Sequence, residues 1–397
     1  MKSKGWWISA AVCCGALVAL GQGPAQPQQG PGVQAARDSR YAEFVATRCK
    51  TPPNAGRGGG ARGPGAGGPG GARGPAAGAP GAGAGRGGPG GPGAQAGGRG
   101  AGGPAPGGFG GGAPRGGAAG GPPAHREYAV TEIPGVIAAG QKWQSVWTGT
   151  GNNADGIIAT SDGGILAAQN TDSAVMKIDR DGKVTFPYKD TNTGGALAMN
   201  KNGDLFIVSR GLPSSVWQLA PKRQLLTDSF NGEPLDCIGG VINDLTADSK
   251  GGVYFTMGGL YYANAKGVVT RYGENLSTNG LILSPDEKTL YVTSRGLVAF
   301  DVQPDGSLTN QRQFAPAGAD GTTVDAQGRV YTTTGSDIQV FAADGKALGS
   351  IPTPLNLITV AFSGPDKKTL YGVANNQQFD EIFKIQMIAQ GYTGRAK

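Results

Sequence analysis

Four oxygen-bearing residues recur at the same phase of a repeated phrase and could together bind a metal ion. Asp155, Asn243, Asn279 and Asp320 each open a short apolar run, as in "NDLTADSKGGVYFTM" and "NGLILSPDEKTLYVTS". Carboxylate and amide oxygens suit a hard cation such as Ca²⁺, and two carboxylates would balance its charge. A single Asn-Gly or Asp-Gly pair is usually a turn. Four such residues in register favour a metal site, provided that the fold gathers them around one axis.

Other catalytic groups are scarce in this chain. The single histidine, His125, falls at the end of a Gly-rich segment, where we expect a solvated linker residue. Without it, neither a Ser-His-Asp arrangement nor a Cys-His pair can form. The sequence also lacks a phosphate-loop pattern and the cysteine pairs of haem or zinc sites. Chemistry would therefore come from a metal ion together with a carboxylate.

Six related phrases supply the elements that must position these oxygens. They recur about every 40 residues from "DGIIATSDGGILAAQ" to "ITVAFSGPDKKTLYGVA". Each joins a short apolar strand through a polar turn to a strand rich in Val, Tyr, Phe and Thr, which is a hairpin signal. Weaker strands with Asp-Gly turns follow. Four antiparallel strands per unit are typical of propeller blades, so residues 126–397 are predicted to form an all-β, six-bladed β-propeller.

The propeller prediction explains how distant residues could meet. The first strand of each blade lines the central channel, and all first strands start at the same mouth. The corresponding positions are Asp155, Gly195, Asn243, Asn279, Asp320 and the pair Ile358-Thr359. Strand alternation should point Asp244, which follows Asn243, away from the channel. Residues 128–150 precede the first copy, and we expect them to supply an outer strand that closes the ring against the last blade.

Two arginines lie in loops expected on the same face as this mouth. Arg210 occurs in "VSRGLPSS" and Arg295 in "VTSRGLVAF". Their N–H groups could bind an anionic or hydroxyl-rich substrate. The alternative is that both are exposed loop charges.

The first 125 residues differ from the rest in composition. Residues 1–21 have two early lysines, an apolar run and small residues, as in a secretory signal peptide. They predict export to the periplasm or the extracellular space. No later run is long enough to span a membrane. Residues 22–53 form a short segment with a possible helix over 36–50, and residues 54–125 form a Gly/Pro/Ala/Arg-rich linker that we expect to be disordered.

The basic charge belongs to this N-terminal part. Residues 1–50 carry +4 and residues 51–125 carry +6, so the total of +7 leaves 7 − 10 = −3 for residues 126–397. This distribution argues against a specific nucleic-acid partner for the folded part, which we expect to be a monomer. The linker arginines predict contact with an anionic surface, or they merely keep the linker solvated.

Export would leave two cysteines in the chain. Cys49 and Cys237 remain after removal of residues 1–21. Two cysteines in an oxidising compartment favour a disulfide. Two unpaired thiols are the alternative.

At its repeats the sequence resembles the senescence marker protein, gluconolactonase and luciferin-regenerating enzyme family of six-bladed propellers. The phrases that carry the resemblance are "INDLTADSKGGVYFT", "NGLILSPDEKTLYVTS", "DGTTVDAQGRVYTTT" and "VAFSGPDKKTLYGVA". The resemblance implies one divalent cation, usually Ca²⁺, held in the channel by a Glu, one or two Asn and an Asp. Asn243 and Asn279 match the Asn positions. Asp320 matches the Asp, which such enzymes use as general base or nucleophile.

The chain departs from this family at two positions. Asp155-Gly156-Ile157 stands where the family has Glu-Gly-Pro, so the carboxylate is one methylene shorter. Val241 stands where sugar-lactone members often have an arginine two residues before the Asn. The first change weakens or widens the metal site, and the second argues against a sugar-acid lactone as substrate.

Three hypotheses follow from the sequence. The leading one is an exported, Ca²⁺-dependent hydrolase of lactones or similar esters, in which the cation polarises the carbonyl and Asp320 takes a proton or attacks. The second is a non-catalytic propeller that binds a ligand or a protein, with a structural metal or none. The third is a surface-adhesion protein whose working part is the arginine-bearing linker.

Overall fold

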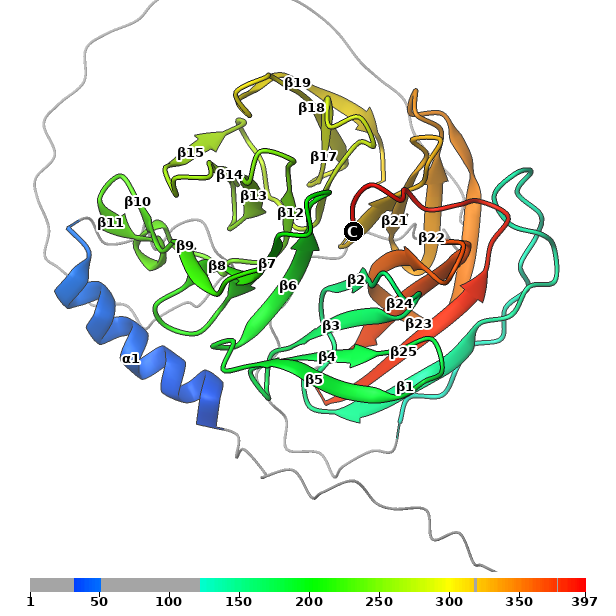
Figure 1. Ribbon diagram of the computed structural model, residues 1–397, viewed down its shortest axis with the longest axis horizontal. Coiled ribbons are helices and arrows are strands. Elements are labelled where there is room, and N and C mark those ends of the chain that lie inside the picture. Colours follow the sequence, from blue (N-terminus) through cyan, green and yellow to red (C-terminus); the bar gives the residue numbers. More distant parts are fainter. Residues whose placement is uncertain (1–31, 51–121, 318–319, 377) are drawn as a thin grey trace, which may run out of the picture. The chain divides into compact units, whose positions relative to one another are not determined.

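The computed structural model describes residues 32–50, 122–317, 320–376 and 378–397, with side chains from Arg40 onward. The predicted signal peptide (1–21) lies outside these residues, as does the predicted linker up to residue 121. Apart from Pro122, the described residues belong to one compact unit. Within the described residues the chain is nearly all β, with one α-helix and one short 3₁₀-helix (Figure 1). That α-helix is too short and too polar to cross a membrane.

Antiparallel sheets make up the folded unit. Four of them have four strands, and in each the first strand in sequence lies at one edge. Their strands are β2 (Ile157–Ala159), β3 (Ile165–Gln169), β4 (Ala174–Ile178) and β5 (Val184–Lys189); β6 (Gly194–Met199), β7 (Leu205–Ser209), β8 (Ser215–Ala220) and β9 (Gln224–Thr227); β12 (Leu245–Ala247), β13 (Val253–Thr256), β14 (Leu260–Ala263) and β15 (Val269–Tyr272); and β16 (Leu281–Leu283), β17 (Thr289–Thr293), β18 (Leu297–Val302) and β19 (Leu308–Ala315). A short hairpin, β10 (Ser229–Phe230) and β11 (Glu233–Pro234), precedes the 3₁₀-helix η1 (Leu235–Ile238).

A seven-stranded sheet completes the unit, in the order β1-β25-β24-β23-β22-β21-β20. Its strands are β1 (Gln144–Thr150), β20 (Thr322–Val324), β21 (Val330–Thr333), β22 (Gly335–Phe341), β23 (Ala347–Ser363), β24 (Thr369–Asn375) and β25 (Phe379–Gln386). The 17-residue β23 connects the two halves of this sheet. Its first part pairs mainly with β22, and from Leu357 to Ser363 it pairs with β24.

The inner strands close into a ring. Each of β2, β6, β12, β16, β20 and β23 contacts the next in this order, and β23 contacts β2 (Figure 1). The C-terminal end of the chain lies near the middle of this ring in the view of Figure 1. The arrangement is propeller-like, as the repeats predicted.

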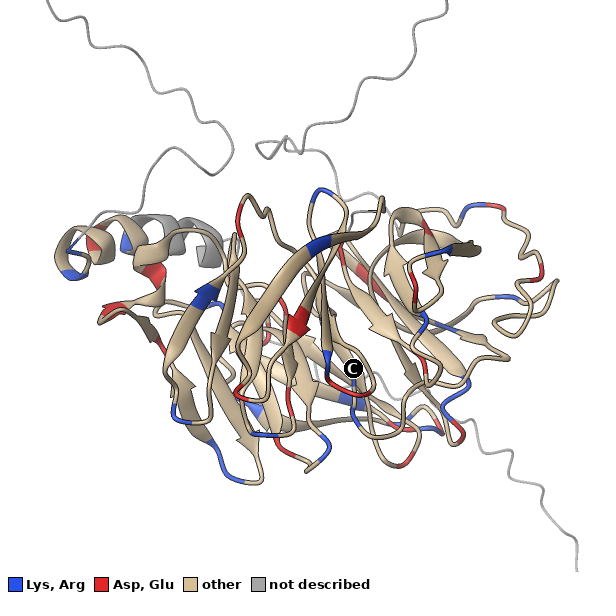
Figure 2. Ribbon diagram, turned by 90° about the horizontal axis from the view of Figure 1, so that it is seen from above, with Lys and Arg blue, Asp and Glu red and all other residues tan. Residues whose placement is uncertain are grey.

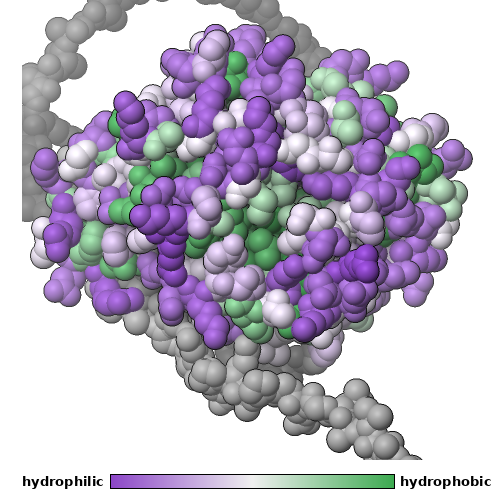
Figure 3. Space-filling model, in the orientation of Figure 1, coloured by the Kyte–Doolittle hydropathy of each residue, from purple (hydrophilic) through white to green (hydrophobic). Residues whose placement is uncertain are grey.

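Burial falls from the inner to the outer strands. Every residue of β2 and β3 is buried, whereas β5 is mostly exposed. Inner strands are covered on both faces by neighbouring sheets, which explains their continuous apolar sequences. One shared core, for example, packs Val208 of one sheet against Leu245 and Phe255 of the next. Full burial of each such side chain contributes about 1.5–3 kcal/mol. The face in Figure 3 is mainly hydrophilic at its rim, and the ribbon in Figure 2 has positive and negative residues interspersed along the chain.

The strand that precedes the first repeat closes the ring, as predicted. β1 pairs antiparallel with β25 and forms the outer edge of the seven-stranded sheet. A buried carboxylate reinforces the junction: Asp380 of β25 accepts a 2.5 Å hydrogen bond from the Asn153 backbone N–H, just before β2. Burial and the negative charge of Asp155 raise the pKa of Asp380 to about 7, against the opposing effect of backbone hydrogen bonds.

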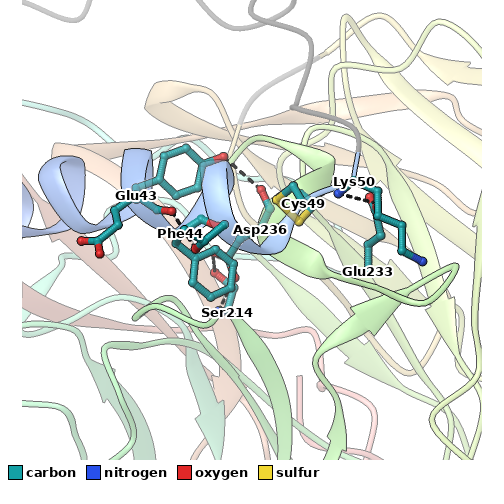
Figure 4. The surroundings of a disulfide bond; sticks show 10 residues. Glu43, Phe44, Cys49, Lys50, Ser214, Glu233 and Asp236 are labelled. Carbon is teal, nitrogen blue, oxygen red and sulfur yellow. Dashed lines mark hydrogen bonds between the residues drawn. A yellow bond between two sulfur atoms is a disulfide. The ribbon is translucent and has the colours of Figure 1, made fainter.

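The helix α1 (Gly32–Arg48) confirms the helix expected over residues 36–50 and begins earlier. A disulfide joins Cys49, just after the helix, to Cys237 in η1, with their Cα atoms 5.4 Å apart (Figure 4). The Tyr41 hydroxyl donates to the Asp236 carbonyl at 3.0 Å. Asp236 in turn accepts two hydrogen bonds from Ser214. The helix is thus fixed to the sheet β6–β9 through η1.

Asp380 should make stability depend on pH. Its pKa rises from 3.8 to about 7 on folding, so the unfolded chain loses this proton first as pH rises. The free energy of unfolding should therefore fall as the pH rises from 3.8 to about 7. Asp380→Asn should reduce the fall by a few kcal/mol, at about 1.4 kcal/mol for each pKa unit. Urea denaturation at about pH 5 and about pH 8 measures the effect, and an unchanged difference between the two pH values would contradict it.

Loss of the disulfide should release α1 and leave the ring intact. The link joins α1 to η1 and does not connect the strands of the ring. For Cys49→Ser we expect rapid tryptic cleavage at Arg40 or Arg48, with a melting temperature within a few degrees of the wild type. Wild-type protein with and without reductant is the control. Unfolding of the sheets, or a helix that stays protected, would disprove this prediction.

Candidate metal and catalytic site

The predicted oxygen ligands occupy equivalent places in the structure. Asp155, Asn243, Asn279 and Asp320 each stand two residues before an inner strand, namely β2, β12, β16 and β20. The backbone N–H groups of Asp155, Asn243 and Asn279 donate to carbonyls at the end of the second strand of their own sheets, at 2.8–3.1 Å. These residues therefore lie in register at one mouth of the ring.

Close approach between sheets explains the glycine that follows Asn279. A Cβ at Gly280 would overlap the carbonyl oxygen of Asp320 in the next sheet. Gly280 does not have a positive φ, so the Asn279-Gly280 pair is not a tight turn of the left-handed type. The Thr293 hydroxyl donates to the carbonyls of Gly280 and Asp320, at 3.1 and 3.0 Å, and locks the two sheets together here.

A continuous set of hydrogen bonds connects the four residues. Arg210 forms an ion pair with Asp155 and donates to Asn243 Oδ1 at 2.7 Å. Asn243 Nδ2 donates to Asn279 Oδ1. The Asn279 side chain is hydrogen-bonded to Asp320. The structure thus brings together all four residues that the repeats singled out, with an arginine between the first and the second.

Arg210 is fully engaged by the protein. Its Nε donates to the Ile242 carbonyl, Nη1 to Asp155 Oδ2 and Asn170 Oδ1, and Nη2 to the carbonyl and side-chain oxygens of Asn243. These five acceptors match the five N–H groups of a guanidinium. The side chain is only 12% exposed. Arg210, predicted to bind substrate, therefore has each donor occupied by a protein acceptor.

A second cation reaches the ring from the end of the chain. Lys397 forms an ion pair with Asp244 and donates to the carbonyls of Leu245 and Leu281 at 3.0 and 3.2 Å. Its side chain is 2% exposed, and burial lowers its pKa while Asp244 opposes that shift. The neighbouring Arg395 is also buried and donates to the Leu283 carbonyl. The repeats gave no signal for this segment, because it lies beyond the last copy.

Asp155 and Asp244 each form an ion pair, whereas Asp320 has no paired cation among the described residues. It is half-buried, and no ion pair to it occurs within the described part of the chain. Burial, together with the charges of Asp155 and Asp244, raises its pKa to about 7. Arg210 and the hydrogen bond from Asn279 act in the opposite direction.

The donor set fits a hard cation through mixed amide and carboxylate oxygens. Asn243, Asn279 and Asp320 are contiguous and supply such oxygens, and Asp320 is a carboxylate whose charge is not compensated. Nowhere among the described residues do three His, Cys, Asp or Glu side chains cluster closely enough to hold a metal. Asp155 faces Arg210. The fit therefore rests on the two asparagines and Asp320.

The second predicted arginine, Arg295, lines a separate cavity of about 620 Å³. Its walls are the loops at 273–276 and 294–296 and parts of β18 and β19, with Gln311 and Gln313 among the polar side chains. Arg295 is exposed. Ser294 follows Thr293, whose hydroxyl binds the Asp320 carbonyl, so the cavity begins beside the candidate site.

His125 lies away from these residues, on the sheet that closes the ring. Its Nε2 is 2.9 Å from Glu381 Oε2, and its ring packs edge-on against Phe383 at 5.3 Å between centroids. The histidine is half-exposed, in keeping with the solvated residue expected, but it is docked on β25. None of its contacts with other described residues brings it into the site.

Residues 192–374 match the family model described as the SMP-30/Gluconolactonase/LRE-like region. A Staphylococcus aureus protein named lactonase drp35 is 26% identical over 214 residues, which are 48% of this chain and 59% of that protein. The chain spans about half the length of the first curated relatives it matches.

Solved structures share the fold. The gluconolactonase from Xanthomonas campestris has a TM-score of 0.54 at 21% identity, covering 67% of this chain and 99% of its own. The calcium-binding protein regucalcin from Agrobacterium tumefaciens has a TM-score of 0.51 at 16% identity, covering 64% and 97%. Over residues 192–374, the chain thus resembles the SMP-30/gluconolactonase/LRE-like family, as its repeats predicted.

Proposed function

We propose that this protein is a divalent-cation-dependent hydrolase of lactones or related esters. The observation that carries the proposal is the row Asn243–Asn279–Asp320 at the mouth of the ring, which ends in an uncompensated carboxylate. The low-identity relatives named lactonase and gluconolactonase support the same reaction class.

Asn243, Asn279 and Asp320 would hold the cation, which would act as a Lewis acid on the substrate carbonyl when bound. The Asp320 carboxylate would accept a proton from water as the water oxygen attacks that carbonyl. The ester C–O bond then breaks, and the proton passes to the leaving oxygen, which gives the hydroxy acid. Direct attack by Asp320 is the alternative route, with water cleaving the acyl intermediate.

Calcium is the cation that we favour. Amide and carboxylate oxygens without sulfur or imidazole suit a hard ion. Regucalcin, which shares the fold, is named a calcium-binding protein.

We further propose that the ring consists of six blades and that the protein is exported. The seven-stranded sheet divides into two groups of four if β23 belongs to both, and the six inner strands that contact in sequence support this count. The Cys49–Cys237 disulfide supports export to the periplasm or outside the cell, because such bonds persist in oxidising compartments.

A second candidate function is a non-catalytic binding propeller. It is favoured by the saturation of Arg210, whose hydrogen bonds engage both Asp155 and Asn243. In that case the cation would be structural or absent, and the face around Arg295 would hold the ligand.

Asp320→Asn should lower lactone hydrolysis at least about 100-fold, since a positioned base contributes roughly 10²–10⁴-fold. A chelator should lower the wild-type rate similarly and leave the variant almost unchanged. Rates on a panel of γ- and δ-lactones and aryl esters, with and without chelator, measure both effects. Asp344→Asn is the matched control, because this exposed carboxylate lies in an Asp-Gly turn that Asn-Gly also suits.

Equal rates for wild type and Asp320→Asn would refute the catalytic role. No turnover of any substrate by the wild type, combined with a rise in melting temperature on addition of Ca²⁺, would favour the binding propeller instead.

We also propose that the cavity beside Arg295 holds the part of the substrate remote from the carbonyl. Arg295→Gln should then raise KM roughly fivefold for a lactone that carries a carboxylate, because an exposed ion pair contributes up to about 1 kcal/mol. The kcat should hardly change. A neutral lactone of the same ring size should show no change in KM, and equal effects on both substrates would argue against this role.

A further inference from the structure

Three carboxylates gather at the mouth of the ring, and the protein supplies cations for two of them. Arg210 pairs with Asp155, and Lys397 pairs with Asp244. Within the described residues, no ion pair compensates the third carboxylate, Asp320. Buried charges are costly unless they are paired, so these two cations are part of the site's construction.

Arg210 occupies a definite place in the ring. The second repeat has Gly195 where the other copies carry Asp155, Asn243, Asn279 and Asp320. A Cβ at Gly195 would overlap the Arg210 guanidinium. The guanidinium therefore fills the empty position of the second repeat, between the side chains of the first and the third.

The contacts of Arg210 favour a role within the protein over substrate binding. Its acceptors come from the loop before β2, the loop after β3 and the loop before β12, and its own loop follows β7. A substrate would have to displace one of five hydrogen bonds to reach it. A divalent ion close to Asp155 would meet a fixed positive charge.

We propose that Arg210 is a built-in cation that withholds Asp155 from a bound divalent ion and weakens the ring's affinity for that ion. The inference rests on the proposed function insofar as the ring binds a cation at all. The ion then binds at Asn243, Asn279 and Asp320, and Asp155 serves to hold the guanidinium. Arg210 is a positioning residue in this arrangement, since it also orients the Asn243 side-chain oxygen.

Calorimetric titration of Ca²⁺ into the full chain, freed of metal beforehand, tests the proposal. Arg210→Met removes the charge and frees Asp155, so it should bind Ca²⁺ at least about tenfold more tightly than the wild type. Arg210→Lys keeps the charge and should stay within about twofold. Arg223→Met is the control, because it removes one positive charge from an exposed turn of the same sheet.

The Asp155→Asn variant provides a second test of the proposal, and its outcome does not depend on whether Arg210→Met folds. The amide oxygen can still accept from Arg210, and the affinity for Ca²⁺ should change by less than about threefold. A loss of tenfold or more would identify Asp155 as a ligand and overturn the proposal. So would an Arg210→Met variant that is folded by near-ultraviolet circular dichroism but binds Ca²⁺ no more tightly than the wild type.

The outcomes separate this inference from the proposed function. If the wild type binds Ca²⁺ and hydrolyses lactones while Arg210→Met has unchanged affinity, the inference fails and the function stands. If no variant binds Ca²⁺ at millimolar concentration, both the inference and the cation in the proposed function fail.

Discussion

The close approach of the inner strands around one axis is the constraint on which the site depends. The inner strands β2, β12, β16 and β20 are buried at every residue, and at Gly280 even a Cβ would meet the next sheet. None of these four strands carries a charged side chain, and the charged groups of the site stand at the strand ends. Residues two positions before a strand therefore share one small space although they lie far apart in the sequence.

Because these residues lie close together, their negative charges must be compensated, and the chain compensates two of them with its own cations. Three carboxylates within one site would repel one another, and each would lose hydration on burial. Arg210 is held by five acceptors, and Lys397 by a carboxylate and two carbonyls. What remains is a single carboxylate, Asp320, which differs from its neighbours in having no such partner among the described residues. Its environment, rather than its residue type, gives it a distinct chemical role.

The repeated phrases predicted the sheets, the inner strands and the meeting of Asn243, Asn279 and Asp320. In a propeller, residues at the same position of successive repeats lie at equivalent places around one axis. They also predicted the closing strand β1, which pairs with β25. The partners of Arg210 could not be predicted, since its five acceptors come from two other sheets and depend on the missing side chain at Gly195. Lys397 and His125 lie outside the repeats, so no periodic pattern indicated that they dock on the ring. The fusion of two strand groups depends on β23 being a single 17-residue strand that pairs with both β22 and β24, which a 40-residue period obscures.

The two departures from the family phrases, at Asp155 and Val241, lie at or next to residues that bind the Arg210 guanidinium. Asp155, one methylene shorter than the family's Glu, is the ion-pair partner of Arg210. Val241, which stands in place of an arginine, precedes Ile242, whose carbonyl accepts from Arg210 Nε. A guanidinium thus reaches Asn243 from the preceding repeat, while position 241 itself carries valine. The Asp155 carboxylate, the Gly195 position without a side chain and the Arg210 guanidinium thus fit one another sterically and electrostatically. A side chain at position 195 would overlap the guanidinium, and loss of Arg210 would leave Asp155 without its ion-pair partner.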